Sequence, residues 1–186
     1  PTSTLLHIGN GAEVASATFD LNGFNQRIGG LISDGTNMPV FVTNSAAGIT
    51  SRLTINTAAP RLYRGSIIGD IELVKTGTGM QELRGISTYT GQTIVSNGTL
   101  RLNGAHFGGG QYSVMSGATL SGTGLIDAAV HILADGIVAP GATSGSLVAS
   151  NTFELDGTLQ IELQNSGGMA GLSDLLDVNG LFDITN

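Results

Sequence analysis

The stretch that decides the fold runs from Leu73 to Leu102 and reads LVKTGTGMQELRGISTYTGQTIVSNGTLRL. It contains eight Thr or Ser and five Gly, no Pro and no long apolar run. Its apolar residues mostly alternate with polar ones, which is the period of a β-strand with one buried face. We therefore interpret the stretch as a structural coil of short strands and turns rather than as an active site.

Five glycines recur at a nearly constant interval from this stretch onward. Each glycine follows a small polar residue, and four of them precede a short strand-like pattern. Small polar residues before Gly favour tight turns, because Gly, Asn and Asp tolerate the left-handed backbone conformation. The glycines of this series are Gly79, Gly98, Gly117, Gly136 and Gly157. Short strands that repeat with a period of about 20 residues are typical of a β-solenoid.

The whole chain is predicted to be one all-β domain over residues 1–186, folded as a parallel β-helix. With about 20 residues and a rise of about 4.8 Å per coil, the chain would make roughly nine coils and reach about 40–45 Å in length. Only 11% of the residues are charged, against an average of about 25%. Sparse charge suits stacked coils, because like charges at equivalent positions of neighbouring coils repel.

Individual strands are predicted where apolar and polar residues alternate. Near the N-terminus this alternation covers residues 16–21, and Asn22-Gly23 then predicts a turn. The other predicted strands are 38–42, 93–96, 99–102, 112–115 and 158–163. No window shows the pattern of an amphipathic helix. The best helical candidate is residues 171–177, with at most one or two turns.

Charge and hydropathy exclude two classes of partner. The net charge is −7, and the seven basic residues are scattered rather than gathered into a stripe that could neutralise phosphates, so nucleic acid is not expected. No run approaches the length of about 18 apolar residues that a helical membrane span requires, so none is expected. The chain has no cysteine, which excludes disulfides and thiolate metal sites. Because it begins at Pro1 rather than Met, we expect a processed product or an excerpt.

The residue types that most often carry chemistry form no recognisable motif. None of His7, His106 and His131 has a second histidine at metal-binding spacing, so we expect packed or solvated rings. For the acidic residues turn formation is the main interpretation, and a Ca²⁺ or catalytic role is the alternative. The acids concerned are the pairs Glu154/Asp156, Asp174/Asp177 and Asp70/Glu72, and Asp135 with Asp156 on neighbouring rungs. We predict no catalytic, cofactor-binding or metal-ligating residue and no cofactor.

The aromatic residues are few, and the chain contains no Trp on which a sugar could stack. We expect the Phe side chains to fill the core and Tyr63, Tyr89 and Tyr112 to cap loops. The two intervals between these tyrosines differ from each other, so a stacked row of them would require coils of unequal length.

Residues 73–102 resemble the autotransporter-associated β-strand repeat. The likeness is carried by Leu73, Lys75, Gly77 and Gly79, then Leu83 and Gly85, then Tyr89, Thr90 and Gly91, then Thr93 and Val95, and finally Gly98, Thr99 and Leu100. Met80-Gln-Glu and Ile86-Ser depart from the usual pattern without disturbing the Gly positions. The resemblance implies a secreted, right-handed parallel β-helix in a stalk on the bacterial cell surface, and it carries no catalytic residues.

Three functions compete on this basis. The first is a non-catalytic extracellular scaffold or adhesive stalk, whose partners are neighbouring solenoid segments. The second is a fibre subunit that assembles with itself head to tail, because residues 1–8 and 181–186 read as strands with no capping helix. The third is a carbohydrate-binding or polysaccharide-cleaving β-helix that acts on surface glycans. Three or more carboxylates in one groove would favour the third; we predict the first or second and no enzyme.

Overall fold

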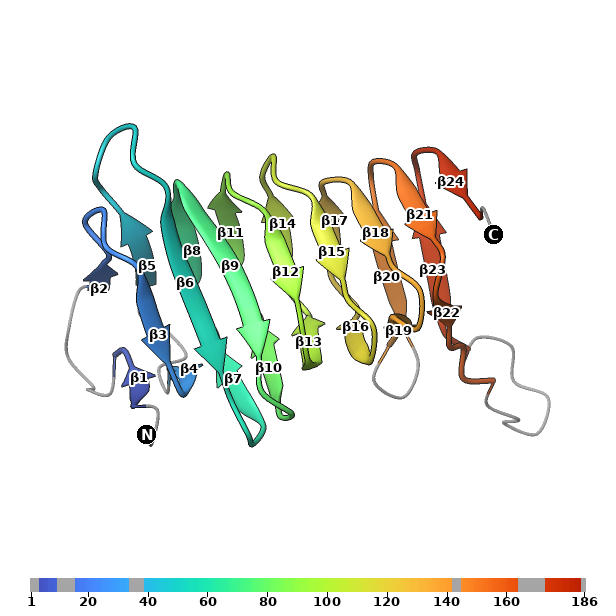
Figure 1. Cartoon of the computed structure of the whole chain (residues 1–186), viewed down its shortest axis with the longest axis horizontal. Coiled ribbons are helices and arrows are strands. Elements are labelled where there is room, and N and C mark those ends of the chain that lie inside the picture. The colour runs from blue at the N-terminus through green and yellow to red at the C-terminus, as the bar shows by residue number, and fades with distance from the viewer. Residues whose placement is uncertain (1–3, 10–15, 34–38, 142–144, 164–172, 185–186) are drawn as a thin grey trace.

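The structure is a computed structural model that describes residues 4–9, 16–33, 39–141, 145–163 and 173–184. Over these residues the chain is built of β-strands, with no helix, and coil stacks on coil from the N-terminal to the C-terminal end (Figure 1). Neighbouring strands within the sheets run parallel. The predicted parallel β-solenoid is therefore confirmed. Within the described ranges no helix is long and apolar enough to cross a membrane.

Three sheets form the walls of the solenoid. Sheet I consists of β2 (Ala17–Asp20), β5 (Val40–Asn44), β8 (Ser66–Gly69), β11 (Ile86–Tyr89), β14 (Ala105–Phe107), β17 (Leu125–Asp127), β20 (Ser146–Ala149) and β23 (Leu175–Val178). Sheet II consists of β3 (Gln26–Ile28), β6 (Ser51–Asn56), β9 (Ile71–Thr76), β12 (Thr93–Val95), β15 (Tyr112–Val114), β18 (Val130–Ile132), β21 (Phe153–Leu155) and β24 (Phe182–Asp183). Sheet III consists of β7 (Arg61–Tyr63), β10 (Met80–Leu83), β13 (Gly98–Leu102), β16 (Ala118–Gly122), β19 (Ile137–Pro140) and β22 (Thr158–Leu159). A separate pair, β1 (Leu5–His7) with β4 (Gly30–Ile32), precedes sheet III.

The number of coils is smaller than predicted. Seven successive coils, from β2–β4 to β20–β22, each contain three strands, whereas the sequence suggested roughly nine. In the middle of the chain β8, β11 and β14 follow one another at the expected period of about 20 residues. However, the intervals from β5 to β8 and from β20 to β23 are clearly longer than this period. The estimate of nine was wrong because extra loop residues lengthen the chain without adding a rung.

The glycine period does mark the turns that separate the strands. Gly98 and Gly117 have φ values of 65° and 73°, and Asp135 takes the same role with φ 61°. The register is not perfectly periodic, because Gly98 lies opposite Ala118 rather than Gly117. A left-handed residue at or just before the start of each of these strands of sheet III turns the chain sharply, and Gly and Asp tolerate this conformation well.

The core is a column of side chains that the three walls enclose. Its aliphatic members include Leu31, Leu53, Ile55, Ile67, Ile71, Leu73 and Leu100, each less than 2% exposed. The three tyrosines are also fully buried, so their prediction as loop caps was wrong. Tyr63 belongs to β7 of sheet III, Tyr89 to β11 of sheet I and Tyr112 to β15 of sheet II, so they form no stacked row. Each phenol finds a hydrogen-bond partner inside, as the Tyr63 hydroxyl does at 3.3 Å from the carbonyl oxygens of Val40 and Ser66.

The helical candidate at residues 171–177 falls partly outside the described residues, and the described part is a strand. Leu175–Val178 pairs in parallel register with Ser146–Ala149. An extended neighbour with free hydrogen-bonding groups outweighs a weak local preference for helix. The strand prediction at 38–42 is confirmed from Val40 onward, and Met38 lies outside the described residues.

Candidate functional site

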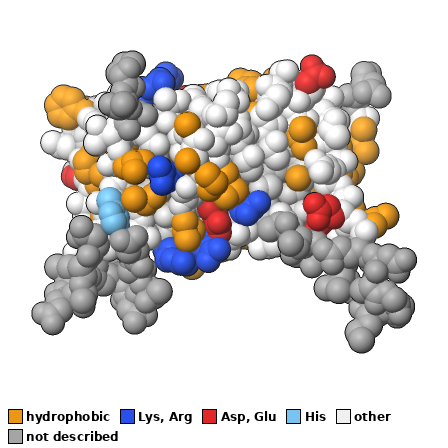
Figure 2. Space-filling view, turned by 90° about the horizontal axis from the view of Figure 1, so that it is seen from below, with side chains coloured by type: hydrophobic (Ala, Val, Ile, Leu, Met, Phe, Trp, Pro, Cys, Tyr) orange, Lys and Arg blue, Asp and Glu red, His pale blue; other side chains and the backbone are white. Residues whose placement is uncertain are grey.

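The outer face of sheet III carries a group of charged and polar side chains from successive strands. The register places Glu82, Arg101 and Ser121 at equivalent positions of three successive strands. Seen from below, charged side chains of both signs lie close together near the middle of this face, between apolar groups (Figure 2). Residues that are one coil apart in the sequence therefore become direct neighbours on one surface.

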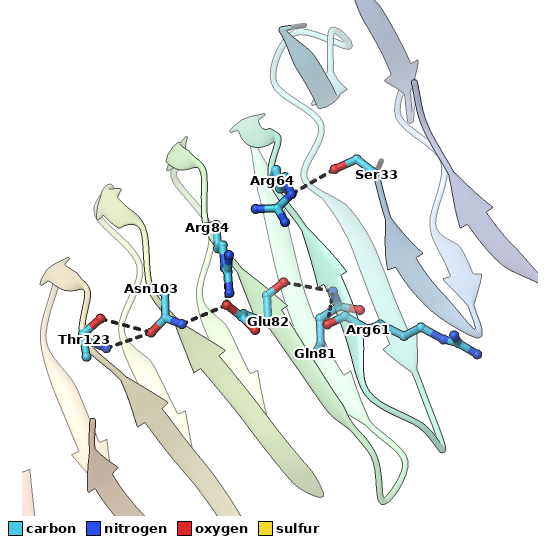
Figure 3. Close-up of polar contacts among 8 residues, drawn as sticks. All are labelled: Ser33, Arg61, Arg64, Gln81, Glu82, Arg84, Asn103 and Thr123. Carbon is cyan, nitrogen blue, oxygen red and sulfur yellow. Dashed lines mark hydrogen bonds and ion pairs between the residues drawn. The ribbon is translucent and has the colours of Figure 1, made fainter. Parts of the chain in front are cut away.

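Glu82 is the centre of a polar ladder that crosses several coils (Figure 3). Its Oε1 accepts hydrogen bonds from Arg84 Nε and, at 2.8 Å, from Asn103 Nδ2. The ladder continues as Thr123 donates its backbone N–H to Asn103 Oδ1 at 3.0 Å. Burial alone would raise the pKa of Glu82, but these hydrogen bonds and the charges of Arg84 and Arg101 lower it overall. The ladder holds a buried carboxylate in its ionised form and ties successive coils together.

At the N-terminal end of the same wall, Gln81 replaces a missing strand pairing. Its side-chain oxygen accepts from the Leu31 backbone N–H at 3.0 Å, and its Nε2 donates to the Leu31 carbonyl at 2.9 Å. The amide thus imitates a strand backbone between β4 and sheet III, which satisfies two buried groups of Leu31. Nearby, Ser33 Oγ accepts from the Arg64 backbone N–H at 2.9 Å (Figure 3).

A cavity of about 170 Å³ lies further along the outer face of sheet III. We call it the sheet III hollow. Its lining comprises Thr99, Arg101, Thr119, Ser121, Ala139, Pro140, Gly141, Gln160, Glu162 and Asp174. The first seven come from β13, β16 and β19 or their ends, and the last three come from the end of β22 and the segment before β23. An insertion between two strands therefore supplies one wall, and the sheet supplies the floor.

Glu162 and Asp174 are joined at the base of that insertion. The Asp174 backbone N–H donates to the Glu162 carbonyl at 3.1 Å, and Asp174 Oδ2 accepts from the Glu162 N–H at 2.9 Å. An isolated bridge between Leu163 and Ser173 follows directly. Gly141 gives the carboxylate its space, since a Cβ at that position would overlap Asp174 Oδ1. The position of Asp174 is therefore set by backbone contacts.

Three residues that line the sheet III hollow each carry an enclosed polar atom with no hydrogen-bond partner among the described residues. These atoms are Arg101 Nε, Ser121 Oγ and Asp174 Oδ1. Ser121 is 5% exposed and Asp174 is 8% exposed. Buried polar groups are nearly always satisfied in folded proteins, and each exception calls for an explanation. The hollow concentrates three such exceptions at one place.

A second polar cluster lies inside the solenoid, around His106. The His106 Nδ1 is 2.9 Å from the Tyr112 hydroxyl, and its ring stacks on Tyr89 with centroids 3.9 Å apart. The Tyr89 hydroxyl is 2.6 Å from Thr93 Oγ1. Burial lowers the pKa of His106, so the neutral ring is favoured. Because all four side chains are buried, the cluster is enclosed and acts as packing, as expected for a packed histidine.

Two of the acid pairs singled out in the sequence, Asp70/Glu72 and Asp174/Asp177, are divided between separate contacts. Glu72 accepts from Arg52 Nε at 2.7 Å, and Asp70 accepts from the Thr50 hydroxyl at 2.8 Å. Asp174 lines the sheet III hollow, and Asp177 is not part of that lining. In these two pairs the structure thus gives each acid a different environment.

His131 joins two of the other predicted acids on the outside of sheet II. Its Nε2 lies 2.7 Å from Asp156 Oδ2, and its Nδ1 lies 3.5 Å from Glu154 Oε2. The predicted face shared by Glu154 and Asp156 is therefore used to bind a histidine. No group of three or more His, Asp or Glu side chains in the described ranges could hold a metal ion.

The sheet III hollow could not be found from the sequence. The hollow contains two carboxylates, those of Glu162 and Asp174, whereas the polysaccharide-cleaving alternative requires three or more in one groove. Arg101 and Ser121 are one solenoid period apart, so the period could have placed them side by side. The period could not have predicted that Glu162 and Asp174 join Arg101 and Ser121, because these two acids belong to an insertion that interrupts the period.

Comparison with known proteins identifies the central stretch. Residues 73–102 match the family model described as the passenger-associated-transport-repeat, which is a repeat family of autotransporter passenger domains. These are the residues on which the resemblance was based, and they span β9 to β13 with the turns between them. A search of the curated proteins found no match. The repeat and the β-solenoid together fit an autotransporter passenger module.

Proposed function

We propose that this chain is a non-catalytic structural module of a bacterial surface or secreted protein, and that it serves as a stiff stalk segment. The observation that carries the proposal is the passenger repeat at residues 73–102 within a continuous parallel solenoid. Each coil is bonded to the next along three walls, so bending requires the rupture of several ladders at once. Such a body suits a spacer that holds other parts of a protein away from the cell.

We further propose that copies of the solenoid stack end to end. At the C-terminal end β22, β23 and β24 are the last strands of their sheets. Exposed apolar side chains gather there, with Leu175 at 55%, Leu181 at 65% and Ile184 at 62% exposure. Open strand edges beside apolar surface favour the addition of further parallel strands. A heterologous contact of this kind repeats without closing and produces a filament.

Electron microscopy and size-exclusion chromatography of the purified chain at micromolar concentration test the stacking. We expect filaments with an axial repeat of about 34–38 Å, because seven coils and the flanking strands rise about 4.8 Å per rung. Leu175→Lys should abolish them, since a lysine on an edge strand opposes pairing with another chain. A stable wild-type monomer would contradict stacking between copies, and the stalk would then have other solenoid segments as its neighbours.

Ile86→Lys provides the matched control for this experiment. Ile86 is 60% exposed on β11, in the middle of the same sheet I that ends with β23. It receives the same change of charge and size, but it lies far from either end. Filaments should therefore persist in this variant, and their loss would show that the added charge acts on solubility rather than on the edge.

A further inference from the structure

We propose that the contact between stacked copies is strictly head to tail, with the first strands of one copy laid on the last strands of its neighbour and Arg27 paired with Asp183. This inference rests on the stacking proposed above and adds its polarity, its register and the charges that select it. The two termini of the chain lie at opposite ends of the solenoid (Figure 1), so each copy offers one end of each kind.

The strands left over at the two ends add up to one further coil. Seven complete coils run from β2 to β22. Beyond them, β23 and β24 at the C-terminal end belong to sheets I and II, whereas β1 at the N-terminal end pairs with β4 and precedes sheet III. In a stack, β1 of one copy therefore supplies the third strand of the coil that β23 and β24 begin in its neighbour. The repeat becomes a whole number of coils, which is eight rungs or about 38 Å.

The pairing register of sheet II brings opposite charges together at this contact. One outward row crosses the whole sheet, and a copy added along this row places its Arg27 directly beside Asp183. Opposite charges at directly opposed positions stabilise strand pairing. In the register of sheet I, Asp20 of the added copy lies beside Asn179, which is neutral. The row of sheet II consists of Arg27, Thr54, Val74, Ile94, Ser113, His131, Glu154 and Asp183.

The inward-facing rows match as well. Six apolar residues pack against the core but are only partly buried, and all six lie on first or last strands. They are Leu6, Ala17, Phe19, Leu159, Leu176 and Val178. In the register of sheet I, Val178 meets Phe19 of the added copy, and Leu176 meets its Ala17. Stacking completes the burial of both ends, and removal of apolar surface from water stabilises the contact.

The charge distribution of the chain selects the head-to-tail orientation. All seven Lys and Arg lie in residues 1–101, together with six Asp or Glu, whereas residues 102–186 contain eight Asp or Glu and no Lys or Arg. Because sequence order becomes position along the solenoid axis, two C-terminal ends repel each other, and a C-terminal end attracts the end that carries Arg27. Neither Arg27 nor Asp183 forms an ion pair with another described residue, so both charges are available to a neighbouring copy.

Paired cysteines test the polarity and the register. The chain has no cysteine, so Arg27→Cys and Asp183→Cys introduce the only thiols. After mild oxidation of the assembled fraction, the double variant should give a ladder of covalent dimers, trimers and longer chains on a denaturing gel. Opposed positions on adjacent strands lie within the Cα separation of about 4.4–6.8 Å that a disulfide spans. Each single variant should stay monomeric on the gel, and covalent dimers of a single variant would show that like ends meet and would overturn the proposal.

Charge reversal tests the ionic pair. Arg27→Asp and Asp183→Arg should each raise the concentration needed for assembly by about tenfold or more, because like charges then face each other. An equimolar mixture of the two variants should assemble as wild type does, since alternating copies restore an opposite pair at every contact. Added sodium chloride should weaken the assembly of wild type and promote that of each single variant. Sedimentation and electron microscopy measure these concentrations.

Arg64→Asp is the matched control for charge reversal. Arg64 is also exposed, but it follows β7 on the second coil and lies on neither end, so assembly should stay as in wild type. If wild type assembles and the reversed variants assemble equally well, the register is overturned while stacking stands. A mixture that fails to assemble would show that Arg27 and Asp183 do not meet. A wild type that stays monomeric would overturn both this inference and the stacking.

Discussion

At the scale of the residue, Lys75 is the most unusual group in the chain. It is the only lysine, and its side chain is fully buried inside β9. Its Nζ donates to the carbonyl oxygens of Thr76 and Gly77 at 2.9 Å and of Asn97 at 3.0 Å. All three acceptors belong to the passenger repeat, so this lysine ties one turn of the repeat to the corresponding turn of the next coil. Burial lowers the pKa of Lys75 to about 8.

The first prediction concerns the pH dependence that Lys75 imposes on stability. The folded state loses this proton near pH 8, whereas the unfolded chain keeps it up to about 10.5. Between these values the unfolded state binds more protons, so the free energy of unfolding should rise with pH. The expected rise from pH 8 to 9 is about 1 kcal/mol. Chemical denaturation at pH 8, 8.5 and 9 measures it.

Lys75→Met should abolish the rise of the free energy of unfolding with pH. Arg52→Met should retain the rise, because it removes a cation that is exposed on the surface. The chain has no cysteine and no second lysine to titrate in the same window. Between pH 9 and 10 the trend should reverse, because burial raises the pKa of Tyr63, Tyr89 and Tyr112, so the unfolded chain begins to ionise its tyrosines before the folded state does. A rise that persists in Lys75→Met would contradict the assignment.

At the scale of the element, the turns between sheets III and I depend on a stack of glycines. A Cβ on Gly85 would overlap the carbonyl oxygen of Gly65, and one on Gly104 would overlap that of Gly85. Gly124 stands in the same relation to Gly104. Each turn therefore sits directly on the turn before it, closer than any side chain permits. This explains why the repeat motif requires Gly85, although its backbone φ is not among the positive ones.

The second prediction follows from this stack. Gly85→Ala should lower the free energy of unfolding by about 1–3 kcal/mol or more, because the added methyl group meets rigid backbone. Gly109→Ala is the control, since a Cβ there has no atom within 4 Å. We expect that variant to be neutral or up to about 1 kcal/mol more stable. Equal denaturation midpoints for the two variants would rule out the steric role of the stack.

At the scale of the whole molecule, the coils behave as interchangeable layers. Ile86 lies opposite Ala105, and Ala105 lies opposite Leu125, so the same position recurs in three successive coils. Contacts run from one coil to the next along all three walls. Stability in such an array is approximately a sum over coils and their interfaces.

The third prediction is that one entire coil can be deleted. Removal of residues 105–124 joins Gly104 to Leu125, and it brings β11, β12 and β13 into register with β17, β18 and β19. The deletion also removes His106 and Tyr112 together, while Tyr89 keeps its contact with Thr93. We expect a folded but less stable β-sheet protein, shorter by about 4.8 Å. Circular dichroism, a thermal melt and small-angle scattering measure these properties.

Deletion of residues 105–114 is the control for this experiment. It removes β14 and β15 but keeps β16, so the remaining strands meet the wrong walls. We expect this half-coil variant to be unfolded or aggregated, because the buried and exposed faces no longer match. If both deletions fold equally well, the layers are not coupled through register as the structure implies.

Strand-forming alternation, the turn glycines and the period of about 20 residues were all readable in the sequence, because they are local or strictly periodic signals. They sufficed for the parallel solenoid and for the repeat at residues 73–102, and the right-handed sense of the coil stays a prediction. The number of coils was not readable, because loop insertions such as the one before β23 consume residues without adding a rung.

The tertiary structure alone decided which side chains share a surface or the interior. Tyr89 and His106 come from β11 and β14 of sheet I and Tyr112 from β15 of sheet II, so they meet only where these two walls enclose the core. The sheet III hollow exists only because an insertion carries Glu162 and Asp174 over a floor that contains Arg101 and Ser121. Local sequence determines the strands, whereas contacts between coils depend on loop length and register, which no local pattern encodes.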